Sequence, residues 1–414
     1  MKLLKVDTVT GAKSKMDQYF SDLKLQKEEL DLYECLGRIA AEDVFSPLNL
    51  PEFNRSTVDG YALKASDTFG ASDSLPVFLE LTGKVEMGQA TDITVSLGEA
   101  VYVPTGGMIP QGADAMVMLE YVEQMDDTTI AVHRPSAPGE NMITIGEDLK
   151  KGDLMLKKGR KIKPQDIGAL AAVGITKIMV FEKPRIAVIS TGDEIVEPAA
   201  NVPFAKIRDI NTYALASLAT ELGAIITYKG VVRDDFQELK EKLSSLINDN
   251  HIVVVSGGSS VGNKDVTARV IDSLGSPGTF VHGVAVKPGK PTIIGKAGNT
   301  ALFGLPGHPV SAIIVFKIFI EYLFKKLNHQ DNQDNYEQRV ITVTAKAGAN
   351  IHSAPGKETY QLVILQGEDA DYVAVPIHGK SGAISLMTHA QGFIRIGHNT
   401  EGIKKGEKVQ VNLL

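Results

Sequence analysis

Apolar residues near the N-terminus recur at three- and four-residue intervals, the spacing of one buried face of an α-helix. The series runs through Met16, Tyr19, Phe20 and Leu23 and continues at Leu30, Leu32 and Leu36. The segment up to about Leu50 is therefore predicted to be helical.

The pattern changes between Val77 and Val132, where short β-rich runs alternate with Gly and Pro. This change predicts a small β domain inserted at about 50–145. A polar, Gly-rich segment then leads to a helix predicted over Pro164–Val173, with Gly174 as its C-terminal cap. Together these parts form an N-terminal helical and β region over residues 1–182.

Strand and helix patterns alternate over residues 183–328. β-Branched runs such as Arg185–Ile189 and Ile252–Val255 are each followed by a segment at helical spacing. Strands that are joined by helices pair in parallel through right-handed crossovers. We therefore expect a doubly wound parallel α/β domain. Its last helix, Val310–Phe324, is apolar but too short to span a bilayer.

The last segment, residues 329–414, alternates apolar and polar positions, as in Arg339–Val343 and Lys408–Val411. This is the period of strands with one buried face, and it predicts a small β barrel.

Composition narrows the class of protein. The chain has 414 residues, a net charge of −7 and one cysteine, Cys35. The length predicts several domains, and the charge argues against a nucleic-acid surface. A single cysteine allows no intrachain disulfide and no zinc finger, so Cys35 is expected in a core. The N-terminus lacks the apolar stretch of a signal peptide, which predicts a cytoplasmic protein without a membrane partner.

Three Gly-rich turns carry the candidate chemistry. They are Ser256–Asp265 after the strand predicted at Ile252, Lys287–Pro291, and Gly304–Ser311 after Ala301–Phe303. In an open α/β sheet such turns lie at the carboxyl ends of strands, where ligands bind. No Walker A loop and no Gly-x-Gly-x-x-Gly fingerprint occur, which argues against ordinary kinases and Rossmann dehydrogenases.

The chemistry of these turns is that of anion binding. Glycines let backbone N–H groups approach phosphate oxygens, and a following helix N-terminus adds partial positive charge. Lys287 and Lys290 add full charges. Asp265 is unsuited to a phosphate contact but suits a divalent cation, so a Mg²⁺ between carboxylate and phosphate is expected.

Ordered motifs along most of the chain resemble those of the molybdopterin molybdenumtransferase (MoeA) family, to which the E domain of gephyrin is similar. Besides the three turns, the motifs are Pro51–Ala62, Pro104–Gly107, Gly112–Ala115, Gly139–Asn141, Gly146–Asp148, Ser190–Glu194, Asp209–Asn211 and Arg233–Asp235. The resemblance implies insertion of molybdate into adenylylated molybdopterin with release of AMP, assisted by Mg²⁺. It also implies a homodimer whose cleft combines the α/β domain of one subunit with the N-terminal β domain of the other.

The resemblance also implies roles for individual residues. Glu194 and Asp265 match the metal ligands, and the positions matching catalytic residues are Asp59, Thr105, Glu194, Asp234, Asp265, Lys287 and Lys290. The positions matching the binding cleft are Ser256, Gly257, Gly258, Ser259, Gly262, Pro288, Gly289, Pro306, Gly307 and Ser381. A molybdopterin adenylyltransferase and molybdoenzyme maturation proteins are the partners implied.

Structural interpretations compete with three of these roles. Glu194 can cap a helix or lie in a loop, Asp59 can hold an Asx-turn, and Asp234 can cap the helix predicted to begin at Asp235.

The chain also departs from the family pattern. Gly283 and Leu362 stand where the family has basic residues, and His308 stands where it has Asn. His282 and Lys357 are nearby charges able to compensate.

Three alternative functions remain open: a tungstate-specific enzyme, an adenylyltransferase and a non-catalytic scaffold. An adenylyltransferase would not account for the motifs between Pro51 and Asp148, and the intact Glu194 and Asp265 argue against a scaffold.

Overall fold

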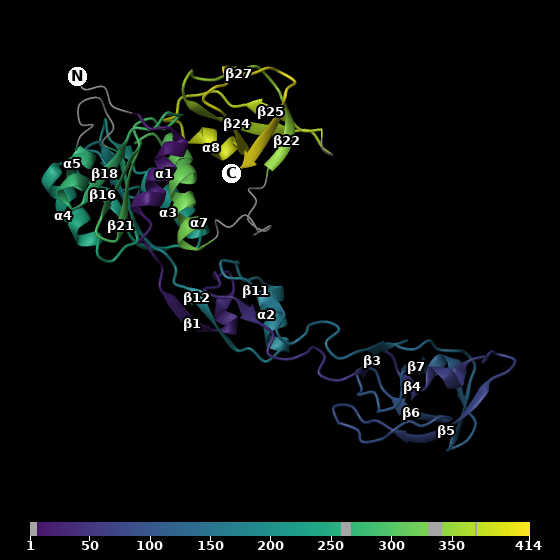
Figure 1. The fold of residues 1–414 in the computed structure, drawn as a ribbon. Coiled ribbons are helices and arrows are strands. Elements are labelled where there is room, and N and C mark those ends of the chain that lie inside the picture. The colour runs from purple at the N-terminus through teal and green to yellow at the C-terminus, as the bar shows by residue number, and fades with distance from the viewer. Residues whose placement is uncertain (1–5, 258–265, 330–341, 369–370) are drawn as a thin grey trace.

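The computed structural model describes residues 6–257, 266–329, 342–368 and 371–414. The molecule is elongated, with an α/β domain and a barrel at one end and a β-rich domain at the other (Figure 1). A small domain around helix α2 connects the two ends.

The first helix, α1 (Val9–Tyr19), belongs spatially to the α/β domain. Met16 is buried in the core of that domain, and the Tyr19 ring stacks on Phe280 with ring centroids 4.5 Å apart. The apolar spacing therefore identified this helix correctly.

The helical prediction fails after α1. Residues Lys27–Asp31 form strand β1, which pairs antiparallel with β12 (Lys177–Phe181), and a short 3₁₀ turn, η1 (Leu32–Cys35), follows. Leu30 lies opposite Ile178 in this ladder. Apolar residues two and four positions apart fit a strand as well as a helix. The pairing of this segment with the distant strand β12 stabilises the strand.

The connecting domain also contains β2 (Val44–Phe45), its antiparallel partner β11 (Leu154–Leu156) and α2 (Pro164–Ala172). Gly174 follows α2 with φ +77°, as a C-terminal cap requires. Cys35 is buried in this core, which confirms its predicted place.

The β-rich domain consists of short strands, as predicted. Its sheet has the order β7-β4-β6-β5-β9-β8. The strands are β4 (Gly60–Leu63), β5 (Val77–Lys84), β6 (Glu99–Val103), β7 (Ala115–Met118), β8 (Val122–Gln124) and β9 (Thr129–Val132). Strands β3 (Arg55–Ser56) and β10 (Met142–Ile143) pair beside it, and η2 (Ala65–Thr68) and η3 (Leu119–Tyr121) are 3₁₀ turns.

The α/β domain has a six-stranded sheet with the order β16-β13-β17-β21-β20-β18. Its strands are β13 (Arg185–Thr191), β16 (Ile225–Val232), β17 (Ile252–Gly257), β18 (Pro277–His282), β20 (Ile293–Ala297) and β21 (Thr300–Leu305). Its helices are α3 (Asn211–Glu221), α4 (Phe236–Leu246), α5 (Val266–Ser273), α6 (Pro309–Val315) and α7 (Glu321–Leu327), with a π-helical turn, η4 (Phe316–Ile320), between the last two. Short β14 (Ile195–Val196) and β15 (Ile207–Arg208) pair outside the sheet.

The sheet is parallel in only four of its strands. β16, β13, β17 and β21 are parallel, whereas β20 is antiparallel to both of its neighbours. Ala297 pairs with Thr300, so only two residues join β20 to β21, and a two-residue turn can link only antiparallel strands. The expectation of a purely parallel sheet is corrected in this respect.

Alternate side chains of the sheet pack on helices at both faces. In β13, Ile186 and Val188 join a core with α1, α3, α6 and α7, while Ala187 and Ile189 join a core with α4 and α5. This double layer is the doubly wound arrangement that the sequence predicted.

The C-terminal segment forms the predicted β barrel. Its strands are β22 (Thr342–Ala347), β24 (Glu358–Gln366), β25 (Val373–Pro376), β26 (Gly392–Ile396) and β28 (Lys408–Leu413), and β24 pairs with β26 to close the barrel. β23 (Ile351–His352), β27 (Gly402–Ile403) and α8 (Ser385–His389) decorate it. β19 (Val286–Lys287), which comes from the α/β domain, pairs with β24.

Among the described residues, no helix combines the length and apolarity needed to cross a membrane.

Candidate functional site

The three Gly-rich turns begin at one edge of the sheet. Thr191 at the end of β13 lies opposite Gly257 at the end of β17, and Ser256 lies opposite Leu305 at the end of β21. β20 is antiparallel to β21, so β20 begins at the edge where β21 ends. The connection from β18 to β20, which contains the second turn, therefore reaches the same edge. The starts of the first and third turns and the connection that contains the second therefore lie at the same edge.

One buried amide joins the first turn to the third. Asn211 Nδ2 donates to Ser256 Oγ at 2.8 Å and to the carbonyl oxygen of Gly307 at 2.8 Å. Ser256 Oγ in turn donates to the Pro306 carbonyl oxygen at 3.2 Å. From the sequence, Asn211 is recognisable only as part of the Asp209–Asn211 motif. The signal that points to its structural role is a polar residue at the first position of a helix that lies behind two Gly-rich turns.

Close packing explains the glycine at the end of β17. Gly257 has φ +129°, and an added Cβ would lie 2.0 Å from the Thr191 carbonyl oxygen. No larger residue fits there without moving the neighbouring strand. The other residues predicted in this turn, Gly258, Ser259, Gly262 and Asp265, lie outside the described residues.

Glu194 follows β13 at the same edge. Its carboxylate folds back over the preceding loop, because a Cβ added at Gly192 would lie 2.9 Å from Glu194 Oε2. The side chain is exposed, and β14 rather than a helix follows it, so the helix-cap interpretation is wrong. An exposed carboxylate is chemically suited to bind Mg²⁺. The described residues contain no cluster of three or more metal-binding side chains, and pairing of Glu194 with Asp265 stays a prediction.

Asp234 also reaches this edge, since it follows β16, whose last residue Val232 lies opposite Thr191. It does not cap α4. The cap is Asp235, whose Oδ1 accepts from the backbone N–H groups of Gln237 and Glu238, both at 2.9 Å. The N-cap interpretation of Asp234 is therefore wrong.

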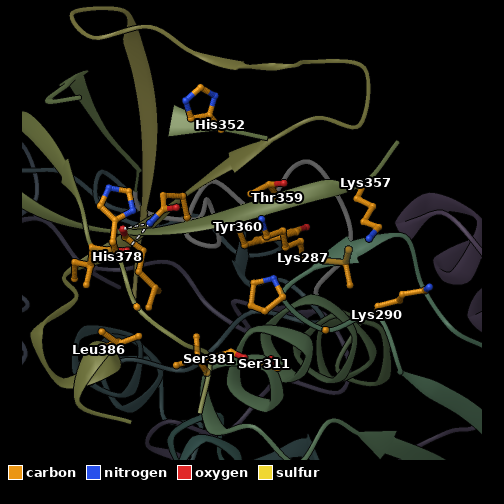
Figure 2. A pocket seen from close by; sticks show the side chains of 18 of the residues that line it. Lys287, Lys290, Ser311, His352, Lys357, Thr359, Tyr360, His378, Ser381 and Leu386 are labelled. Atoms are coloured by element: carbon orange, nitrogen blue, oxygen red, sulfur yellow. Dashed lines mark hydrogen bonds between the residues drawn. The ribbon is translucent and has the colours of Figure 1, made fainter. Parts of the chain in front are cut away.

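A cavity of about 620 Å³ lies between the second turn and the barrel (Figure 2). Pro288 and Gly289 line it, with the hydroxyl-bearing residues Ser311, Thr359 and Ser381. Ser381 connects the barrel to the third turn, since its Oγ lies 2.8 Å from His308 Nδ1 and its carbonyl oxygen accepts from the Val310 N–H at 3.2 Å. The cavity thus combines the second and third turns with the barrel.

The charge of the cavity is positive. Lys287, Lys290 and Lys357 line it, together with His352 and His378. Within the described part of the chain, no carboxylate lines the cavity and none of its three lysines forms an ion pair. Cations that are held together without a protein counterion favour an anionic ligand.

The departures from the family pattern have local structural reasons at two positions. Gly283 is buried with φ +96°, a conformation that disfavours a basic side chain. Leu362 is only 5 % exposed and belongs to the α/β core. Leu362 also lines the cavity, so this side of the cavity has an apolar side chain where the family has a charge.

Asp59 and Thr105 lie together but far from the sheet edge. The Thr105 N–H donates to Asp59 Oδ1 at 2.8 Å, which joins two loops of the β-rich domain. This hydrogen bond joins residues that are far apart in the sequence, whereas an Asx-turn is a local bond. The Asx-turn interpretation of Asp59 is therefore wrong. Figure 1 shows this domain at the opposite end of the molecule from the α/β domain, so one chain does not bring the two sets of residues together.

Comparison with known proteins defines the class first. Residues 8–174 match the MoeA N-terminal region (domain I and II), residues 187–326 a probable molybdopterin binding domain, and residues 344–414 the MoeA C-terminal region (domain IV). The fold is that of a multidomain protein built around a molybdopterin-binding type of α/β domain.

Full-length relatives make the assignment specific. The chain is 36% identical to a putative molybdopterin biosynthesis protein of Methanocaldococcus jannaschii, over 97% of this chain and 95% of the relative. It is 32% identical to a molybdopterin molybdenumtransferase of Haemophilus influenzae, over 98% of both chains. A crystal structure of a molybdopterin biosynthesis MoeA protein from Pyrococcus horikoshii superposes with a TM-score of 0.84 at 38% identity, covering 99% of both chains. The chain belongs to the MoeA family, as its motifs predicted.

Proposed function

We propose that this chain is a molybdopterin molybdenumtransferase, which inserts molybdate into adenylylated molybdopterin and releases AMP during molybdenum cofactor biosynthesis. The observation that carries the proposal is the cavity beside the convergent turns of the sheet, whose three lysines form no ion pair with any residue that the structure describes. Relatives at 32% and 30% identity that bear this enzyme name support it.

The geometry supports different roles for the sheet edge and the cavity. Ser256, Gly257, Pro306 and Gly307 lie at the sheet edge and would form a cradle for the pterin phosphate. Lys287, Lys290 and Ser381 line the neighbouring cavity and would hold molybdate there. The proposed Mg²⁺ ligands are Glu194 and Asp265, and the ion would neutralise charge on the phosphate bond that breaks.

A homodimer is part of the proposal. Asp59 and Thr105 form a hydrogen-bonded pair in the β-rich domain. Within one chain, this domain lies away from the edge of the α/β sheet. A second copy of the chain would supply this pair to the cleft, and the active site would then be shared. We also propose a cytoplasmic location, with a molybdopterin adenylyltransferase as the supplier of substrate and molybdoenzyme maturation proteins as recipients.

A turnover assay tests the proposed function. The purified protein is mixed with adenylylated molybdopterin, Mg²⁺ and molybdate, and AMP is measured, with tungstate in a parallel arm. Release that requires molybdate supports the proposal, and release with tungstate alone identifies a tungstate enzyme. Formation of adenylylated molybdopterin from ATP would identify an adenylyltransferase. Ligand binding without AMP release would identify a scaffold.

A further inference from the structure

We propose that Lys357 is a specificity-determining residue of this chain, which adds a third cation to the cavity and selects a tetrahedral dianion as its ligand. The inference rests on the proposed function and deepens it. Lys287 and Lys290 come from the α/β domain, whereas Lys357 comes from the barrel. A ligand held by all three would connect the two domains.

Strand pairing places Lys357 beside the second turn. β19 and β24 pair in parallel, with Val286 opposite Glu358 and Lys287 opposite Thr359. Lys357 directly precedes β24, and side chains two positions apart on a strand share a face. Lys357 therefore lies on the Thr359 side, near Lys287. Figure 2 shows Lys357 and Lys290 at the same side of the cavity, with His378 and Leu386 opposite.

The turn that carries Lys357 is held by its own hydrogen bonds. The Lys357 N–H donates to the Ala354 carbonyl oxygen at 3.1 Å. Thr359 Oγ1 accepts from the Ala354 N–H at 3.3 Å and lies 3.1 Å from Ser353 Oγ. The Lys357 backbone is thus held at the cavity wall, and only its side chain has to be ordered when an anion binds.

Lys357 lines the cavity without a counterion in the described part of the chain, whereas Lys346 of the same barrel has one. Lys346 pairs with Asp371 at 2.7 Å. No ion pair forms at Lys357 within the described ranges, although it shares a cavity with two further cations. The buried carboxylate next to it, Glu358, instead accepts from Arg395 Nε at 2.7 Å. Mutual repulsion of three lysines is relieved more by a ligand with two negative charges than by one with a single charge.

The chemistry of the cavity thus favours a small, doubly charged tetrahedral oxyanion over a monoanion. Hydroxyl groups of Ser311 and Ser381 also line the cavity, and they are donors suited to oxyanion oxygens. Leu362 of β24 lines the same cavity without a charge, and Lys357, directly before β24, supplies the positive charge from this part of the barrel.

Equilibrium binding of molybdate, followed by isothermal titration calorimetry at low salt, tests the inference on the full-length chain. Replacement of the charge in Lys357→Gln or Lys357→Met should weaken molybdate binding about tenfold or more, the effect of losing one charge-assisted hydrogen bond. Lys357→Arg should retain most of the affinity. Perchlorate, a tetrahedral monoanion, should compete poorly with wild-type protein and relatively better with the Gln variant.

The matched control is Lys404→Gln, which removes the same charge from an exposed barrel position outside the cavity and should leave affinity unchanged. Thermal unfolding of every variant verifies the fold. Wild-type affinity in both folded Lys357 variants, together with weakened binding in Lys287→Gln, would overturn the inference and leave the proposed function intact. Absence of oxyanion binding and of AMP release in the wild-type protein would instead refute the proposed function itself.

Discussion

A single side chain, Asn211, holds the first and third turns in register, and its replacement should separate fold from ligand binding. In Asn211→Asp, both donated hydrogen bonds are lost and the new carboxylate faces the Gly307 carbonyl oxygen. Each bond contributes about 1 kcal/mol to stability, and the loss at a buried site is larger. We expect unfolding stability to fall by about 2–3 kcal/mol and pterin binding to weaken.

The control for this change is Asn350→Asp, because the exposed Asn350 uses its oxygen, Oδ1, to accept from the Lys405 N–H, and Asp retains that acceptor. Chemical denaturation and equilibrium binding of adenylylated molybdopterin measure the two effects. Unchanged pterin affinity in folded Asn211→Asp would show that the turns keep their positions without the amide.

The positive charge of Lys287 is expected to contribute directly to ligand binding. Lys287→Ala should weaken binding of the adenylylated pterin or the oxyanion by about 1.5–3 kcal/mol, the range for hydrogen bonds to charged groups. The side chain is exposed, so the loss should shrink as salt concentration rises. Binding titrations at low and high salt measure both effects, and equal affinity of wild type and variant at low salt would contradict the charge-based account.

At the scale of single residues, the sequence predicted which residues lie close together. It predicted the local structural role of each residue less well. Ser256 and Gly307 were correctly placed at one edge because strand ends carry that information. Asp234 and Asp235 are chemically equivalent neighbours, and only backbone geometry selects Asp235 as the helix cap.

Among the elements, strand β24 couples the cavity to the interface between the barrel and the α/β domain. Its Glu358 is buried and accepts hydrogen bonds from Arg395 and, at 3.2 Å, from the Tyr360 hydroxyl. Burial, with the adjacent Glu358 carboxylate, raises the pKa of the Tyr360 hydroxyl, so this hydroxyl stays protonated as a donor.

Removal of the guanidinium in Arg395→Met leaves that carboxylate short of a partner. We expect the free energy of unfolding at pH 7 to fall by about 2 kcal/mol, the order for a charged group left underbonded. Chemical denaturation at pH 7 measures the loss, and a folded Arg395→Met protein with wild-type stability would contradict this explanation.

Element prediction succeeded where the apolar pattern was local and failed where a distant partner decided. Helices α3, α4 and α5 were predicted from their own spacing. The segment at β1 has spacing compatible with helix or strand, and its pairing with β12 settled the outcome. The antiparallel strands β18 and β20 were not predicted. The helical connections elsewhere indicated parallel strands, whereas the short turn at residues 298–299 requires an antiparallel pair.

At the scale of the whole molecule, the distance between the Asp59 domain and the α/β domain predicts a site shared between two copies. An inactive Asp59→Ala chain mixed with an inactive Asp265→Asn chain should recover about a quarter of wild-type activity, because half of the exchanged dimers rebuild one of their two sites. Two differently tagged chains verify that exchange occurred. Exchanged mixtures that remain inactive would place Asp59 outside the shared site.

The most direct measurement is a single-turnover assay of AMP release from adenylylated molybdopterin by wild-type, Glu194→Gln and Asp265→Asn proteins, with and without Mg²⁺. If the sheet edge is the reaction centre, wild-type release depends on both Mg²⁺ and molybdate. Either variant should lose release by several orders of magnitude and keep its fold and thermal midpoint, because the lost carboxylate serves the metal and not the core. Mg²⁺-dependent AMP release that continues at the wild-type rate in either folded variant would contradict the account.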